Sequence, residues 1–207
     1  MASPGKILLI LDLDETLIHA CAMRLAREED FRLFDYYVYV RPHVERFLTE
    51  CAAHFQLAVW SSATDDYVAE VVKRIFPREL TPAFAWGRSR CTFALDRAGV
   101  QEFGYLDPSN HYNYVKKLHK LKRKGYRLER TLIVEDTPSK CAHNYGNAIY
   151  VKEYNGEEGD NELPALSRYL ATLKDAANVR TIEKRHWRAV VGHQTRPAVV
   201  DGLEPGS

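Results

Sequence analysis

Five short runs of apolar and aromatic residues predict the strands of this protein. Each run is too short for a helix and has polar residues or proline beside it, which is typical of β-strands. The run Ile7–Leu11 is apolar at every position, as expected for a strand that is buried on both faces of a sheet. The predicted strands occupy residues 6–11, 36–40, 55–60, 131–134 and 148–151.

Four other segments predict helices, because their apolar residues recur three or four positions apart. Pro42 and Thr64 suit the starts of the first two helices, and Gly125 suits the end of the third. The apolar positions are Val44, Phe47, Leu48 and Cys51; Val68, Val71, Val72 and Ile75; Val115, Leu118 and Leu121 within residues 114–124; and Leu163, Leu166, Leu170 and Leu173.

The alternation of strands and helices predicts an α/β fold of three Rossmann-like layers, a mostly parallel sheet with helices on both faces. Proline and glycine interrupt residues 77–111, so we expect loops and short strands there, and residues 17–35 form a second short insertion. Neither insertion has the apolar core of a large cap domain. We therefore expect a single domain over residues 1–190 and a loose tail over residues 191–207.

Length, charge and hydropathy limit the classes of protein to which the chain can belong. Its 207 residues suit one domain, and a formal net charge of +1 excludes a globally basic nucleic-acid coat or an acidic tail protein. The chain has no run of about 18 apolar residues, and its N-terminus lacks the pattern of a signal peptide. We therefore expect no membrane partner and a cytoplasmic location, or a nuclear one in a eukaryote. The four cysteines are far apart and should be reduced packing residues.

Polar residues follow three of the predicted strands at the point where each strand ends. Asp12 and Asp14 follow the first strand, Ser61 follows a later one, and Glu135 and Asp136 follow the run that ends at residue 134. Ligands of parallel α/β sheets bind at the carboxyl ends of the strands. These distant segments should therefore meet at one edge of the sheet.

The sequence Asp12-Leu-Asp14-Glu-Thr after a buried strand resembles motif I of the haloacid dehalogenase (HAD) superfamily of aspartyl phosphatases. The other three motifs of that superfamily have counterparts in the same order along the chain. Motif II resembles LAVWSSATDDYV with Ser61, motif III resembles YVKKL with Lys116, and motif IV resembles TLIVEDTP with Glu135 and Asp136. The resemblance covers residues 6–152 and implies the HAD fold.

This resemblance implies a phosphoric monoester hydrolase that works through an aspartyl-phosphate intermediate. A carboxylate that attacks phosphorus divides hydrolysis into two steps, and this role is assigned to Asp12. Asp14 would protonate the leaving alcohol and then activate water, which requires a raised pKa and a partly desolvated position. The attacking carboxylate and the substrate phosphate are both anions and repel each other, so a cation is required. Mg²⁺ suits this role, with Asp12, the backbone carbonyl of Asp14, and Asp136 as its ligands. Glu135 would orient the groups beside them.

The same resemblance supplies candidates for binding the substrate phosphate. Lys116 and the Ser61 hydroxyl would hold the phosphoryl oxygens as negative charge spreads over them. Thr16, which would support the loop, and Ser62, the second candidate for motif II, would also bind the substrate phosphate. Arg88 in GRSRC either binds the substrate phosphate or is a surface arginine.

The segments RPHVERFL, GRSRC and NYVKKL narrow the resemblance to the small RNA polymerase C-terminal-domain phosphatases and the NLI-interacting-factor-like group. A site without a large cap favours a large substrate, such as phosphoserine or phosphothreonine in an extended phosphorylated protein segment. Two alternatives stay open: a HAD phosphatase acting on a small metabolite or nucleic-acid 3′-phosphate, and a non-catalytic phosphopeptide-binding module. The basic residues around Lys120 resemble a nucleic-acid patch, but such runs are more often a solvated helix face, so nucleic acid is not the favoured partner.

Overall fold

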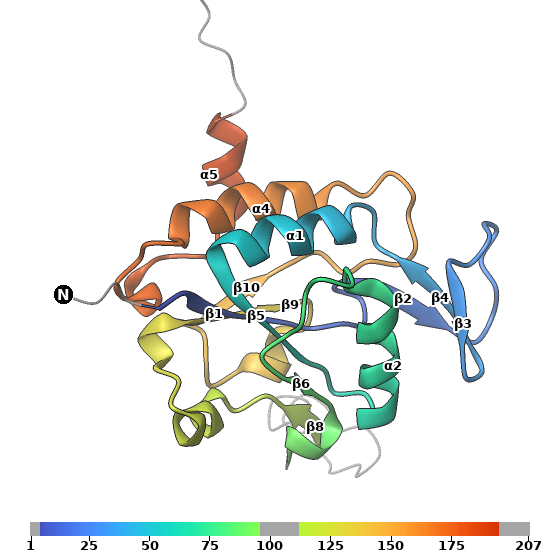
Figure 1. The fold of residues 1–207 in the computed structure, drawn as a ribbon, viewed down its shortest axis with the longest axis horizontal. Coiled ribbons are helices and arrows are strands. Elements are labelled where there is room, and N and C mark those ends of the chain that lie inside the picture. The colour runs from blue at the N-terminus through green and yellow to red at the C-terminus, as the bar shows by residue number, and fades with distance from the viewer. Residues whose placement is uncertain (1–4, 96–111, 195–207) are drawn as a thin grey trace, which may run out of the picture.

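The computed structural model describes residues 5–95 and 112–194, with a five-stranded parallel sheet at its centre (Figure 1). The strands lie in the order β10–β9–β1–β5–β6, so β1 is the middle strand, and every neighbouring pair is parallel. All five positions of β1 are buried, which explains its unbroken aliphatic run. The bounds are Ile7–Leu11 for β1, Phe55–Trp60 for β5, Ala85–Trp86 for β6, Thr131–Glu135 for β9 and Ala148–Tyr150 for β10.

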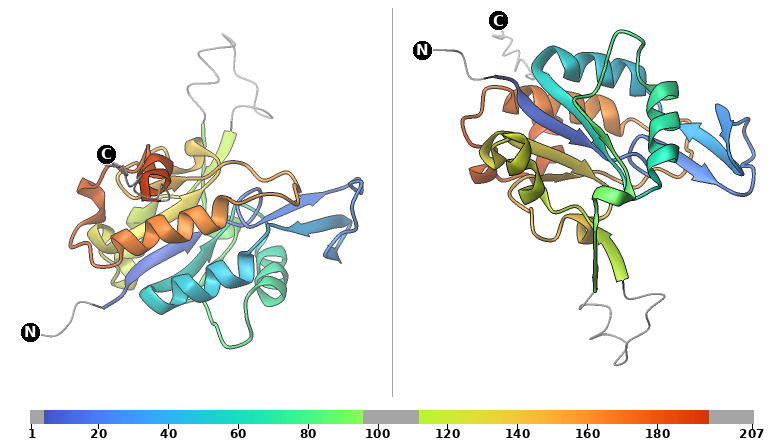
Figure 2. Two further views of the ribbon diagram at one scale, coloured as in Figure 1. Left: turned by 90° about the horizontal axis from the view of Figure 1, so that it is seen from above. Right: turned by 60° about the horizontal axis from the view of Figure 1, so that its bottom comes forward.

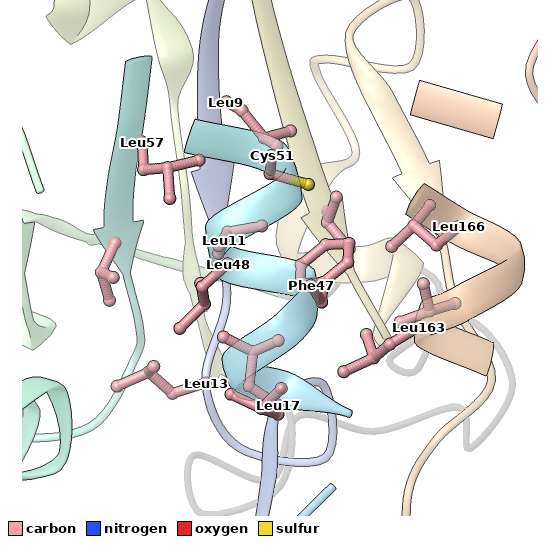
Figure 3. Packing of buried hydrophobic residues seen from close by; sticks show 14 of the residues in the cluster. Leu9, Leu11, Leu13, Leu17, Phe47, Leu48, Cys51, Leu57, Leu163 and Leu166 are labelled. Atoms are coloured by element: carbon pink, nitrogen blue, oxygen red, sulfur yellow. The ribbon is translucent and has the colours of Figure 1, made fainter. Parts of the chain in front are cut away.

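Four α-helices of the described chain cover one face of this sheet. In Figure 3, Phe47 and Leu48 of the first helix lie over Leu11 of β1, and Leu163 and Leu166 of a second helix complete the cluster. Their spacing of three and four residues keeps each apolar stripe on the sheet side of its helix. The helices are α1 (Val44–His54), α2 (Asp65–Ile75), α4 (Glu162–Leu173) and α5 (Trp187–Gln194).

Short 3₁₀ turns cover the opposite face of the sheet. Leu118, Leu121 and Cys141 from these turns pack there against Leu8 and Trp60 of the strands. The predicted three-layer α/β fold is therefore confirmed, with 3₁₀ turns instead of α-helices in one outer layer. The turns are η2 (Leu118–Lys124), η3 (Leu128–Arg130) and η4 (Pro138–Cys141), and a further turn, η5 (Val179–Thr181), precedes α5.

Two small antiparallel sheets extend away from the central sheet (Figure 2). The predicted strand over residues 36–40 belongs to the first of them and not to the central sheet. The strands over residues 18–21, 31–33 and 92–95 lie in the predicted insertions 17–35 and 77–111, whereas those over residues 36–40 and 112–115 follow them. The described residues contain no cap domain. The first consists of β2 (Ile18–Cys21), β4 (Tyr36–Val40) and β3 (Phe31–Leu33), and the second of β7 (Thr92–Leu95) and β8 (Tyr112–Val115).

The helix predicted over residues 114–124 is wrong. The run Tyr-Asn-Tyr-Val forms β8, because aromatic and β-branched residues favour a strand when a partner such as β7 is available. Leu118 and Leu121, three positions apart, match the three residues per turn of the 3₁₀ turn η2. Gly125 ends this turn as expected, with a φ of 83° in the left-handed region.

Two smaller features also differ from the sequence-based expectation, and a third agrees with it. Pro42 precedes α1 instead of lying in its first turn, since the helix begins at Val44. The segment 77–111 contains β6, a two-residue outer strand of the central sheet, as expected for a region of loops and short strands. The predicted tail begins inside α5, where Val191 is buried. Residues 96–111 and 195–207 of these two segments lie outside the described residues.

Two further observations concern the cysteines and the length of the helices. All four cysteines are free, as the sequence predicts. Over residues 5–95 and 112–194, no helix combines the length and the hydropathy needed to cross a lipid bilayer.

Phe47 tests how much stability comes from packing of α1 on the sheet. Its side chain is buried, so Phe47→Ala should lower the free energy of unfolding by about 3–5 kcal/mol, from lost apolar contact and the cavity left behind. Urea unfolding followed by circular dichroism measures this value. The control Arg46→Ala, at the neighbouring exposed position, should change it by less than about 0.5 kcal/mol. An equal loss in both variants would contradict the described packing.

Candidate active site

The carboxyl ends of three neighbouring strands bring the predicted site residues together. The strands β9, β1 and β5 are adjacent and parallel, so the chain leaves all three at the same edge of the sheet. Asp12 follows β1, Ser61 follows β5, and Glu135 is the last residue of β9. The strand order alone therefore places these distant segments side by side.

Lys116 is a buried positive charge between two carboxylates. Its ammonium group donates to one oxygen of Asp12 and, at 2.6 Å, to one oxygen of Glu135, and none of the three side chains is more than 1% exposed. Burial alone disfavours the charged amine, but Asp12 and Glu135 outweigh it and hold the pKa of Lys116 above its ordinary value. The backbone N–H of Lys116 also donates to the carbonyl oxygen of Lys140 at 2.8 Å. This hydrogen bond fixes the backbone position from which the Lys116 side chain reaches the two carboxylates. Lys116 is thus a permanent cation of the site.

Asp14 lies on the turn after β1 and receives hydrogen bonds from two hydroxyl groups. The Ser61 hydroxyl donates to one carboxylate oxygen at 3.1 Å, and the Tyr67 hydroxyl donates to the other at 2.9 Å. Burial and the nearby Asp12 carboxylate raise the pKa of Asp14 despite these hydrogen bonds. A half-buried carboxyl group with a raised pKa and a fixed orientation is suited to both donating and accepting a proton.

The turn after β1 is held in a strained backbone conformation. Glu15 has a φ of 59°, in the left-handed region that residues other than glycine rarely adopt. Its N–H donates to the carbonyl oxygen of Ile18 at 2.7 Å, and its carbonyl oxygen accepts from the N–H of Tyr154 at 2.8 Å. Burial and the neighbouring carboxylates, first among them Asp14, raise the pKa of Glu15 to about 7. Strain of this kind persists only where surrounding contacts enforce it, and it is common at functional sites.

Asp12, Glu135 and Asp136 form a carboxylate cluster whose oxygens lie within 4.8 Å of one another. Lys116 contacts one oxygen of Asp12, whereas the other, Oδ2, is buried and accepts no hydrogen bond. A buried carboxylate oxygen without a donor is costly unless a cation faces it. Mg²⁺ and similar hard cations bind carboxylate oxygens, so the residues present fit a divalent cation.

The other three candidates for binding the substrate phosphate lie in different surroundings. Thr16 is buried, and its hydroxyl donates to Asp136 at 3.5 Å, so it supports the carboxylate cluster. Ser62 and Arg88 line a groove of about 540 Å³ that also exposes Asp14. The Nε atom of Arg88 donates to the backbone carbonyl of Ser62 at 2.8 Å, which holds the arginine at the edge of this groove.

A close backbone approach positions Arg88. Gly87 precedes the turn η1 (Arg88–Arg90), and a Cβ atom at this position would lie 2.8 Å from the Cα atom of Asp65. The Asp65 carboxylate accepts hydrogen bonds from the N–H of Gly87 at 3.2 Å and from the hydroxyl of Ser89 at 2.9 Å. Since a side chain at position 87 does not fit, glycine is required for η1 to dock on the start of α2.

The groove beside Asp14 also has apolar lining at the turn between β3 and β4. Phe34 and Tyr36 line it and are 58% and 43% exposed. Phe34 has a φ of 51°, which is a rare conformation for a bulky residue. An exposed aromatic ring therefore lines the same groove as a candidate catalytic carboxyl group.

Three residues of the site were missed by reasoning from the sequence. Tyr67 stands among the apolar positions of α2 and therefore reads as a core residue, although its hydroxyl reaches Asp14. Lys140 has its Nζ atom 3.5 Å from Glu135 and 3.7 Å from Asp136, and no motif marks it. Arg41 lies in RPHVERFL, and the charged residue before a predicted helix was a signal that could have been followed.

Arg41 links the turn after β1 to the segment after β10 through hydrogen bonds. Its buried guanidinium makes two hydrogen bonds of 2.8 Å to the carboxylate of Asp160. It also donates to the carbonyl oxygens of Thr16 and Lys152, both at 3.0 Å. Bidentate arginine–carboxylate pairs fix geometry as well as charge, so Arg41 positions the turn through the backbone of Thr16.

Comparison with known protein families and relatives gives consistent matches. The family model described as NLI interacting factor-like phosphatase matches residues 7–180. CTD small phosphatase-like protein 1 of Caenorhabditis elegans is 29% identical over 172 residues, which cover 77% of this chain and 30% of that protein. The CTD small phosphatase-like protein of Homo sapiens is 27% identical over 193 residues, which cover 87% of this chain and 61% of that protein. This chain thus spans less than two thirds of the length of either relative.

A solved structure shares the fold. It is the structure of Fcp1, an essential RNA polymerase II CTD phosphatase, with a TM-score of 0.54 and 17% sequence identity. The match covers 91% of this chain and 62% of that chain. At this level of identity the likeness concerns the fold, and it confirms the α/β sheet expected from the sequence.

Asp160→Asn tests whether Arg41 holds the turn. Although burial opposes ionisation, the Arg41 guanidinium keeps the pKa of Asp160 below its ordinary value. Such a carboxylate stabilises the fold at pH values above its pKa in the unfolded state, which is about 4. This stability is lost as the pH falls through the lower pKa that the group has in the folded state. At pH 7 the variant should therefore lose about 3 kcal/mol of unfolding free energy, because Arg41 stays buried without its partner.

Urea unfolding across a pH series measures this effect. The gap between wild type and Asp160→Asn should narrow as the pH falls below about 4. Asp175→Asn, at an exposed position, is the matched control and should show no such gap. A loss that is the same at every pH would contradict the role assigned to the ion pair.

Proposed function

We propose that this chain, which belongs to the NLI interacting factor-like phosphatase family, hydrolyses phosphoserine or phosphothreonine in proteins through an aspartyl-phosphate intermediate. The observation that carries the proposal is the pair of aspartates after β1. Asp12 is buried against the permanent cation Lys116, and Asp14 is half-buried between two hydroxyl donors at the edge of a groove. The two carboxyl groups therefore have separate environments, which suit a nucleophile and a general acid–base.

In the first step, the carboxylate of Asp12 attacks phosphorus. A bond forms between an Asp12 oxygen and phosphorus while the bond from phosphorus to the serine or threonine oxygen breaks. Asp14 gives its proton to the departing oxygen, which leaves as the free hydroxyl group of the substrate. Lys116 stabilises the negative charge of the Asp12–phosphoryl unit as the charge spreads over the equatorial oxygens.

In the second step, water hydrolyses the aspartyl-phosphate. The water oxygen bonds to phosphorus and the bond to Asp12 breaks, which releases inorganic phosphate and restores the carboxylate. Asp14, now ionised, accepts a proton from the attacking water and returns to its starting state. The hydroxyl groups of Ser61 and Tyr67 keep Asp14 oriented for both proton transfers.

A divalent cation, Mg²⁺ in this proposal, would be held by the carboxylates of Asp12 and Asp136 and by the backbone carbonyl of Asp14. When bound, it supplies positive charge that reduces the repulsion between the Asp12 carboxylate and the phosphate. Glu135 accepts a hydrogen bond from Lys116 and thereby keeps that ammonium group beside Asp12. The buried Oδ2 atom of Asp12, which accepts no hydrogen bond, is the observation that supports a cation here.

The groove beside Asp14 supports an extended protein segment as the substrate. It offers the aromatic rings of Phe34 and Tyr36 for an apolar side chain, and the Arg88 guanidinium for phosphate or carboxylate groups. No cap encloses it within the described part of the chain, so a long substrate can pass over the site. Fcp1, which shares the fold, is by its name a phosphatase of the RNA polymerase II CTD, and a protein substrate for this chain agrees with that.

Replacing the two aspartates tests the mechanism. With p-nitrophenyl phosphate and Mg²⁺, Asp12→Asn should abolish turnover, because the amide cannot attack phosphorus. Asp14→Asn should lower kcat by about 10²–10⁴-fold through loss of general acid–base catalysis. Asp175→Asn is the matched exposed control. Full turnover by Asp12→Asn would exclude the proposed nucleophile.

Phe34 tests the substrate class. The variant Phe34→Ala, which lacks the ring, should raise KM for a phosphoserine peptide by about ten-fold. Burial of such a ring against the peptide contributes roughly 1.5–3 kcal/mol to the free energy of binding. KM for p-nitrophenyl phosphate should rise less, because that substrate is too small to follow the groove. Met23→Ala is the control, as Met23 is an exposed apolar residue that does not line the groove.

A substrate panel separates protein substrates from the alternatives. Phosphopeptides, phosphorylated metabolites and 3′-phosphorylated oligonucleotides would be compared by kcat/KM under one set of conditions. The proposal requires the highest value for phosphopeptides. A clear preference for a metabolite or for an oligonucleotide would overturn the assignment of the substrate while leaving the aspartate chemistry in place.

A further inference from the structure

Two lysines approach the carboxylate cluster, and they contact different oxygens of it. Lys116 contacts Oδ1 of Asp12 and Oε2 of Glu135. The Nζ atom of Lys140 lies 3.9 Å from Oδ2 of Asp12, 3.5 Å from Oε1 of Glu135 and 3.7 Å from Oδ1 of Asp136. Lys140 therefore faces the oxygens that Lys116 leaves free.

Two of the three oxygens that face Lys140 belong to carboxylates that would hold a divalent cation, those of Asp12 and Asp136. Oδ2 of Asp12 is buried and accepts no hydrogen bond, so it has a free lone pair for a metal. Asp136 is the second carboxylate assigned to the metal above, and its Oδ1 atom lies on the Lys140 side. At 3.5–3.9 Å the ammonium group pairs with these oxygens through charge and not through short hydrogen bonds.

The charges in the cluster explain why a second lysine is useful. Three carboxyl groups share this space, and Lys116 pairs with those of Asp12 and Glu135. Among residues 5–95 and 112–194, Lys140 is the other cation within 4 Å of these carboxylates. Without it, the Asp136 carboxylate would lose its ion pair with this ammonium group in a largely buried space, and a carboxylate buried without a counter-charge is costly.

Lys140 differs from Lys116 in its freedom to move. The side chain of Lys116 is fully buried, whereas that of Lys140 is 20% exposed. The backbone of Lys140 is fixed, because its N–H donates to the carbonyl of Thr137 at 3.1 Å and its carbonyl accepts from Lys116 at 2.8 Å. Its ammonium group sits on a flexible four-carbon stem with a path to solvent. The group can therefore withdraw while the turn η4 stays in place.

We propose that Lys140 is an internal counter-ion of the carboxylate cluster that competes with the divalent cation for the oxygens of Asp12 and Asp136. It stabilises the fold when no metal is bound and weakens metal binding, because its withdrawal must accompany metal entry. Lys140 is thus a positioning residue that acts through the metal ligands. This inference rests on the proposed function for the identity of the cation.

Isothermal titration of the purified protein with MgCl₂, without substrate, tests the competition. Lys140→Gln should bind Mg²⁺ about ten-fold more tightly than wild type, since a competing positive charge is removed from the site. Lys140→Arg keeps the charge and should stay closer to wild type than to the glutamine variant. Lys174→Gln makes the same change of net charge at an exposed position outside the cluster and should bind as wild type does.

Thermal unfolding supplies a second readout that does not depend on activity. In EDTA, Lys140→Gln should have a lower Tm than wild type, and saturating Mg²⁺ should reduce or reverse this difference. If Lys140→Gln does not fold, Lys140→Met retains the apolar stem without the charge and takes its place.

Unchanged or weaker Mg²⁺ binding by the uncharged variants would overturn the competition. A protein that shows the competition but hydrolyses no phosphate monoester would instead overturn the proposed function. The two failures are therefore distinguishable.

Discussion

Carboxylates at the ends of adjacent parallel strands repel one another, and Lys116 is what allows Asp12 and Glu135 to be buried side by side. The strand order brings them together, because β9 and β1 are neighbours and end at the same edge of the sheet. The lysine enters from the loop after β8 and pairs with both. Removing one member of such a buried set would leave an uncompensated charge, so the cation and the carboxylates depend on each other.

This charge balance is supported by contacts that shape the turn after β1. Arg41 binds the carbonyl of Thr16 and the carboxylate of Asp160, and Glu15 holds a left-handed conformation fixed by two backbone hydrogen bonds. The turn therefore presents Asp12 inward to the cations and Asp14 outward to the groove. Two aspartates separated by one residue can differ in burial because these contacts hold the backbone of the turn in place.

Much of the fold and part of the site could be predicted from the sequence. The continuous aliphatic run of β1 and the polar residues after β1, β5 and β9 indicated a parallel sheet with one functional edge, since strand periodicity and strand ends are local properties. The structure brings Asp12, Lys116 and Glu135 into contact. Lys116 could be identified from its sequence motif, although the helix predicted around it was wrong. The strand β8 forms there instead because it pairs with β7, and such pairing is a long-range interaction.

The sequence by itself determined which residue types stand at the ends of the strands, and therefore the kind of chemistry that the edge can support. The tertiary structure alone decided the partners of those residues. The Tyr67 hydroxyl on Asp14, the Arg41–Asp160 pair and the Lys140 ammonium beside the carboxylate cluster all join segments far apart in the chain or sit where no motif marks them. Hydrogen bonds and ion pairs depend on distances of a few ångströms between side chains, and only packing of the whole chain fixes those distances.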